Sequence, residues 1–111
     1  MTESLLEKTC VPCQGGIPPL DPAEAERLAA QVPGWSLLDG GRRLERAYRF
    51  DDFAEALAFV NALGALSEVE FHHPDICFGW GSCTVSWQTK KIAGLHENDF
   101  IMAAKTDALI G

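Results

Sequence analysis

The sequence has few basic residues and no long apolar run. Lys and Arg number 9 among 111 residues, against 16 Asp and Glu, which gives a formal charge of −7. This deficit argues against the basic surface that neutralises nucleic-acid phosphates. No segment approaches the ~20 apolar residues that a membrane-spanning helix needs. With an apolar content of 47%, the chain fits a single compact domain that could still bind a protein partner.

The first residues also lack the apolar stretch of a secretory signal. Met1 to Lys8 contains two acidic residues and no hydrophobic core segment, so we expect a cytoplasmic protein. In a reducing compartment the four cysteines are expected to be thiols. The Cys10-x-x-Cys13 pair could be half of a zinc site or a redox motif. However, it lies in a Pro-rich segment without a second Cys pair at zinc spacing, so we interpret it as part of an extended arm.

The chain is predicted to divide into an irregular N-terminal arm over residues 1–20 and a folded domain over residues 21–111. The domain opens with a helix from the Asp21-Pro22 cap to Pro33. A strand at 35–38, a turn at 39–41 and an alternating strand at 42–50 follow, then a helix from about 52 to 67. Two further strands flank Gly81-Ser82, and a last helix follows Gly94-Leu95. This order predicts an α+β fold, helix-strand-strand-helix-strand-strand-helix, with a four-stranded antiparallel sheet and three helices on one face.

Finer packing predictions follow from the same patterns. Phe53, Leu57 and Val60 are predicted to form the main buried stripe of the second helix. A two-residue turn at Gly81-Ser82 would pair Trp80 with Cys83, and Phe78 with Val85. Cys77 would then face away from Cys83, which argues against a disulfide between them. The other detailed expectations are that Arg46 marks a sheet edge or a partly hydrated position, and that the last helix packs through Phe100, Ile101, Ala104 and Ala108.

The adjacent pair His72-His73, followed by Pro74, is the strongest chemical signal. Imidazole has an unperturbed pKa of about 6.5, which suits proton transfer near neutral pH. Pro74 restricts His73 to an extended backbone, so the two rings should point in different directions. Taken alone, the dipeptide could equally be an ordinary helix exit. A metal site is less favoured because no His-x-x-x-His spacing is present. The three Trp residues (35, 80 and 87) could stack on a planar ligand but more often belong to a core.

Several motifs together resemble the pterin-4a-carbinolamine dehydratase family. They are Glu68-x-x-x-His72-His73-Pro74, the aromatic residue Trp80, and the run from Thr89 to Asp99 (TKKIAGLHEND). The resemblance covers the chain from about Asp21 onward. It implies dehydration of a 4a-hydroxytetrahydropterin to the quinonoid dihydropterin, a hydro-lyase step in tetrahydrobiopterin recycling, with no metal and no organic cofactor.

The resemblance also implies roles for individual residues. The predicted catalytic set is His72 as an acid/base residue, His73, Asp99 and Lys90, and the predicted pterin-binding set is Glu68, His73, Pro74 and Trp80. Lys90 departs from the family, which usually has a histidine at that position. An ammonium group with a reference pKa of ~10.4 is a poor proton donor at neutral pH. A slower or more restricted reaction is therefore one expectation.

Other readings remain open at this point. Animal members of the family also bind a transcription factor, and some bacterial relatives are similar to assembly factors for a carbon-fixing enzyme. A non-catalytic assembly or dimerisation factor that binds a protein partner is therefore the alternative, and Lys90 favours it. A pterin-handling role near molybdopterin metabolism is a third possibility. The resemblance further implies a homodimer or homotetramer, and the apolar breadth of the second helix is compatible with such an interface.

Overall fold

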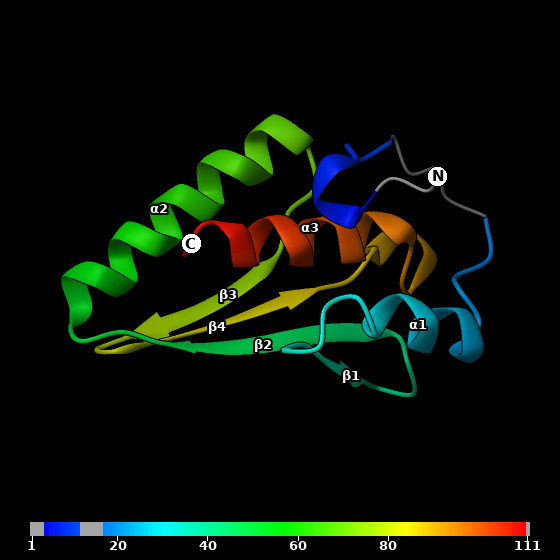
Figure 1. The fold of residues 1–111 in the computed structure, drawn as a ribbon, viewed down its shortest axis with the longest axis horizontal. Helices are drawn as coiled ribbons and strands as arrows, with labels where there is room; N and C mark the ends of the chain where they lie inside the picture. Colours follow the sequence, from blue (N-terminus) through cyan, green and yellow to red (C-terminus); the bar gives the residue numbers. More distant parts are fainter. Residues whose placement is uncertain (1–3, 12–16, 111) are drawn as a thin grey trace.

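The computed structural model describes residues 4–11 and 17–110. These residues form three α-helices and a four-stranded sheet, whose arrangement can be followed in Figure 1. The helices are α1 (Pro22–Ala29), α2 (Phe53–Glu70) and α3 (Glu97–Ala108). The strands are β1 (Ser36–Leu38), β2 (Arg43–Arg49), β3 (Asp75–Gly79) and β4 (Ser82–Trp87). Two short 3-10 helices, η1 (Leu5–Glu7) and η2 (Lys90–Ile92), complete the described elements.

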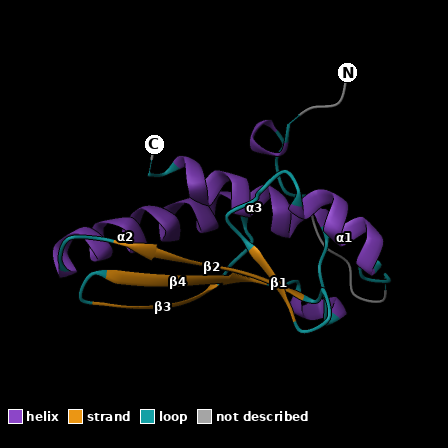
Figure 2. Cartoon of the chain, turned by 60° about the horizontal axis from the view of Figure 1, so that its bottom comes forward, coloured by secondary structure: helices purple, strands orange, loops and turns teal. Residues whose placement is uncertain are grey.

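The four strands form one antiparallel sheet in the order β1-β2-β4-β3. The helices lie on one side of this sheet, as Figures 1 and 2 show, with α1 at the end nearest β1. Leu44, Val85 and Trp87 face the helices and are fully buried. The predicted α+β architecture is therefore confirmed. No helix in the described ranges is long and apolar enough to cross a bilayer.

Local capping residues fix where the helices begin. The Asp21 side chain accepts a hydrogen bond from the Glu24 backbone N–H at 2.9 Å, and Glu24 completes a capping box. The Asp52 carboxylate accepts from the Glu55 N–H at 2.8 Å at the start of α2. These carboxylates satisfy backbone donors that have no partner within the helix, and the Asp21 cap agrees with the sequence prediction.

The buried face of α2 differs from the predicted stripe. Phe53 and Leu57 are 43% and 39% exposed, whereas Phe59 and Leu63 are buried against the sheet. The helix is apolar around most of its circumference, so periodicity alone did not identify the face that the sheet covers. In α3 the predicted core residue Ala108 is exposed because it lies in the last turn.

The β3–β4 turn is shifted by one residue from the prediction. Gly79 pairs with Ser82, Phe78 with Cys83 and Ile76 with Val85, so Trp80 and Gly81 form the turn. Gly81 has a φ of +71°, and a Cβ there would lie 3.0 Å from the Phe50 carbonyl oxygen. Glycine is therefore favoured at the second turn position, because any side chain there would strain the backbone and crowd this oxygen. The predicted pairs of Trp80 with Cys83 and of Phe78 with Val85 were wrong.

The shift moves partners by two residues and so leaves every side chain on its predicted face. Cys83 is buried while Cys77 is exposed on the opposite face, and both are free thiols. The prediction that they do not form a disulfide is confirmed. Arg46 lies beyond the residues of β2 that pair with β1, and its side chain is 34% exposed. This placement agrees with the expected partly hydrated edge position.

Candidate active site

The end of α2 places two imidazoles in different surroundings. Phe71 ends the helix in the left-handed conformation, with φ 53° and ψ 45°, and the His72 N–H then bonds to the Ser67 carbonyl at 3.2 Å. The His72 side chain is only 13% exposed, whereas that of His73 is 51% exposed. The prediction that the two rings point in different directions is therefore confirmed.

His72 is held by a buried carboxylate. Its Nε2 lies 2.7 Å from Oδ1 of Asp99, which is fully buried in the first turn of α3. The other carboxylate oxygen accepts from Thr89 Oγ1 at 2.7 Å and from the His96 N–H at 3.0 Å. Because the carboxylate accepts at Nε2, the neutral ring carries its proton there. The Nδ1 atom makes no hydrogen bond with residues 4–11 or 17–110.

A buried indole fixes the plane of the same imidazole. The rings of His72 and Trp87 lie nearly parallel, with an interplanar angle of 7° and centroids 5.5 Å apart. Trp87 is fully buried near the end of β4. The contact restricts rotation of His72, so the ring is oriented before any ligand binds. Trp87 and Trp35 are core residues, as their place on apolar strand faces indicated.

The outer imidazole belongs to a more open pair. His73 Nε2 contacts the Glu68 carboxylate, and the edge of its ring meets Phe71 at a centroid distance of 5.7 Å. Both His73 and Glu68 are well exposed. Water screens such a pair and weakens it, so His73 can exchange its protein partner for a ligand.

A cavity of about 500 Å³ lies beside the two histidines. Its wall includes His72, His73 and Pro74 from the α2–β3 connection and Lys90 from η2. Cys10 and Val11 of the N-terminal arm also line it. This volume falls in the usual range for small-molecule pockets. Glu68 and Asp99 contact the imidazoles without lining the cavity.

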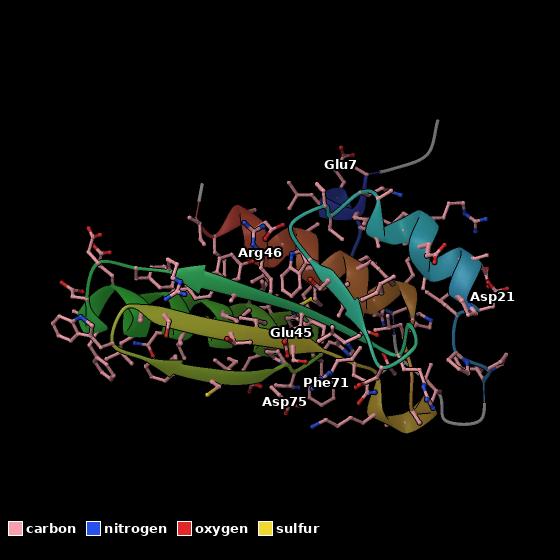
Figure 3. All side chains as sticks on the ribbon, turned by 90° about the horizontal axis from the view of Figure 1, so that it is seen from below. Glu7, Asp21, Glu45, Arg46, Phe71 and Asp75 are labelled. Carbon is pink, nitrogen blue, oxygen red and sulfur yellow. The ribbon has the colours of Figure 1, made fainter. Side chains whose placement is uncertain are left out.

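Two predicted site residues have other placements. Lys90 lines the cavity, but its Nζ donates to Asp75 Oδ1 at 3.1 Å and both side chains are 69% exposed. Trp80 lies in the β3–β4 turn, is 75% exposed and is absent from the cavity wall. Figure 3 shows Phe71 and Asp75 near the start of β3, the end of the hairpin that carries the cavity.

Sequence reasoning missed several residues of the wall. Glu70 and Asn98 line the cavity and bind the N-terminal arm rather than the histidines. Asn98 precedes Asp99 in the family motif, so the sequence already included it. Its hydrogen bonds to Val11 in the arm could not be predicted from that motif. Burial and the nearby Glu70 carboxylate raise the pKa of the Cys10 thiol to about 12, so it is uncharged at neutral pH. The described residues contain no group of three or more His, Cys, Asp or Glu side chains suited to a metal ion.

Comparisons with known proteins agree on one family. Residues 18–109 match the profile described as pterin 4 alpha carbinolamine dehydratase. A protein of Aromatoleum aromaticum named "Putative pterin-4-alpha-carbinolamine dehydratase" is 61% identical over 98% of this chain and 97% of its own length. A protein of Azoarcus sp. with the same name is 63% identical over 100% of this chain and 95% of its own length.

Two solved structures share the fold. A transcriptional coactivator/pterin dehydratase from Brucella melitensis has a TM-score of 0.78 and 28% identity, over 84% of this chain and 99% of that chain. A pterin dehydratase-like protein, described as a RuBisCO assembly factor in the alpha-carboxysome, has a TM-score of 0.61 and 30% identity. That match covers 70% of this chain and 94% of that chain. Relatives with this fold thus carry the names of an enzyme and of protein-binding factors.

Proposed function

Because the chain belongs to the pterin-4-alpha-carbinolamine dehydratase family, we propose that it converts 4a-hydroxytetrahydropterin to quinonoid dihydropterin and water. The observation that carries the proposal is the His72–Asp99 hydrogen bond at a cavity that can hold a small ring system. It gives one imidazole a fixed orientation, a fixed tautomer and an accessible nitrogen.

The reaction requires one proton to be donated and another to be removed. Hydroxide is a poor leaving group, so protonated His72 donates from Nδ1 to the hydroxyl as the carbon–oxygen bond at C4a breaks. Water leaves, and the neutral imidazole then accepts a proton released by a nitrogen of the pterin ring. The enzyme returns to its starting state and the substrate has lost one water molecule. Asp99 offsets the charge that His72 gains with each proton.

The outer pair serves binding in this scheme. His73 contacts Glu68 where both side chains meet solvent, and it lies on the cavity wall with Pro74. Such groups can donate to and accept from the polar edge of a pterin. Lys90, whose Nζ donates to Asp75 Oδ1, would contribute electrostatically from the cavity wall. The acid/base work is therefore assigned to His72, with His73, Glu68 and Pro74 binding the ring.

A stopped-flow ultraviolet assay on freshly generated 4a-hydroxytetrahydropterin tests the proposal. Wild type should accelerate dehydration above the spontaneous rate, and the double variant His72→Ala/His73→Ala should return it to that rate. The double variant must keep the wild-type thermal midpoint to within a few degrees. Equal acceleration by both proteins would exclude the histidine mechanism, and no acceleration by wild type would exclude the dehydratase.

A second candidate function is that of a protein-binding assembly or dimerisation factor. Its support is the assembly-factor description of one similar structure and the coactivator description of the other, together with Lys90 where the family usually has histidine. A partner that co-purifies in fixed stoichiometry, together with absence of pterin turnover, would favour this function. Pterin dehydration by the Lys90→His variant but not by wild type would also favour the protein-binding function.

Self-association is part of the proposal. Val69, Phe53 and Leu57 on α2 are 80%, 43% and 39% exposed, and apolar side chains on a free helix face are typical of subunit interfaces. Sedimentation should give a dimer or tetramer. Replacement of Leu57 and Val69 by Glu should reduce the assembly size, and a wild-type protein that sediments as a monomer would contradict the expectation.

A further inference from the structure

Most of the N-terminal arm precedes residue 18, where the match to the family profile begins. Residues 4–11 of the arm nevertheless pack into the fold. Leu5 is 4% exposed in the main core, and η1 lies against α3 (Figures 1 and 2). Lys8 forms an ion pair with Glu97 at 2.8 Å at the start of α3. The arm is therefore fixed at one end by burial.

Past Lys8 the arm is held by side chains that line the cavity. The Cys10 N–H donates to Glu70 Oε1 at 2.8 Å. Asn98 binds Val11 at both backbone groups: Oδ1 accepts from the Val11 N–H at 3.1 Å, and Nδ2 donates to the Val11 carbonyl at 2.7 Å. A side-chain amide thus pairs with the arm as a neighbouring strand would. Asn98 is only 2% exposed whereas Val11 is 55% exposed, so a buried amide holds a residue that lies at the surface.

These bonds place two arm residues on the cavity wall that also contains His72 and His73. Val11 and the Cys10 thiol are uncharged, in contrast to the imidazoles and carboxylates nearby. A planar heteroaromatic ring has polar edges and apolar faces, so it requires both kinds of surface. Without the arm this boundary of the pocket would be open to water, and the Asn98 amide would have lost its partners.

We propose that Cys10 and Val11 form one wall of the pterin pocket, and that Asn98 is the positioning residue that holds this wall in place. This inference rests on the function proposed above and assigns the arm to the same site. The arm contributes to the affinity for the ring and takes no part in proton transfer. Its loss should therefore raise KM and Kd while kcat stays close to that of wild type.

Full-length variants separate these effects. Asn98→Ala removes both bonds to Val11, Val11→Ala trims the wall while leaving the backbone bonds, and Leu6→Ala is the matched control. Leu6 is 49% exposed on η1 and is absent from the cavity wall. The readouts are KM and kcat from the stopped-flow assay, the thermal midpoint, and the Kd of an oxidised, unreactive pterin measured by calorimetry.

The inference predicts a Kd and KM raised on the order of tenfold in Asn98→Ala and roughly threefold in Val11→Ala. Values of kcat should remain within about twofold, and Leu6→Ala should bind as wild type does. A lower thermal midpoint in Asn98→Ala with unchanged Kd would overturn the inference and leave the arm a purely stabilising element. That result would leave the dehydratase intact, whereas a wild type that neither binds nor turns over pterin would overturn both.

Discussion

Nε2 of His72 lies 2.7 Å from Oδ1 of Asp99, a carboxylate fully buried in the first turn of α3. The ring lies nearly parallel to that of Trp87 on β4. Side chains from α3 and β4 therefore both contact the imidazole, which lies in the α2–β3 connection. This relationship fixes the side chain to which we assign proton transfer in the proposed function. His73, one residue further on, contacts two exposed side chains, Glu68 and Phe71.

Asp99→Asn should lower kcat roughly 10- to 100-fold with little change in KM. An amide that still accepts from Thr89 and the His96 N–H must turn its NH₂ group toward His72. The imidazole would then carry its proton on Nδ1, the atom that must accept one. Nitrogen-15 NMR of the histidine rings would show this change of tautomer, and an unchanged tautomer with unchanged kcat would contradict the assignment.

Phe71→Gly should stabilise the protein by about 1 kcal/mol, measured by urea unfolding. Phe71 has a φ of 53° and is 85% exposed, so it bears the cost of a left-handed backbone with little burial in return. Glycine adopts this conformation without that cost. Phe71→Ala retains the strain and serves as the control. Equal stability of the two variants would show that backbone strain is not the cause.

Asp107→Asn should destabilise the fold by about 1–3 kcal/mol. The Asp107 carboxylate accepts from Tyr48 Oη at 2.5 Å, from Arg46 Nη1 at 2.9 Å and from Trp35 Nε1 at 3.1 Å. It thereby ties α3 to β2 and to the start of β1, and Figure 3 shows Arg46 reaching toward α3. Asp51→Asn, at an exposed carboxylate, is the control for urea unfolding. Equal effects of the two substitutions would contradict the assignment.

Stability should fall as the pH rises above about 10. Burial first, and then the hydrogen bond to Asp107, raise the pKa of Tyr48 above its usual value. The phenol of the unfolded chain ionises near its ordinary pKa while the folded phenol stays protonated. The unfolded state therefore binds fewer protons in this range, and the free energy of unfolding decreases with pH. Tyr48→Phe should reduce that slope between pH 9 and 11, and an unchanged slope would contradict the prediction.

The sequence was sufficient for features that depend on neighbouring residues. Asp21 marks the start of α1 because capping is a local interaction, and an alternating pattern marked the strand that is β2. The turn at Trp80-Gly81 was placed one residue too late because Gly-Ser is itself an acceptable turn.

Contacts between distant segments were harder to predict. The buried face of α2 depends on how the sheet meets a helix that is apolar nearly all round. The arm's bonds to Glu70 and Asn98 join residues 60 and 87 positions apart, and no local pattern marks them. The histidine pair was found because its chemistry and motif are contiguous, and Asp99 because the family motif includes it.

The division of labour between the two histidines is the central claim, and steady-state kinetics of His72→Ala and His73→Ala tests it most directly. Stopped-flow dehydration at saturating and limiting substrate gives kcat and KM for each variant. The account predicts that His72→Ala loses nearly all kcat, whereas His73→Ala keeps kcat and raises KM. A His72→Ala enzyme with wild-type kcat, or a larger loss of kcat in His73→Ala, would contradict it.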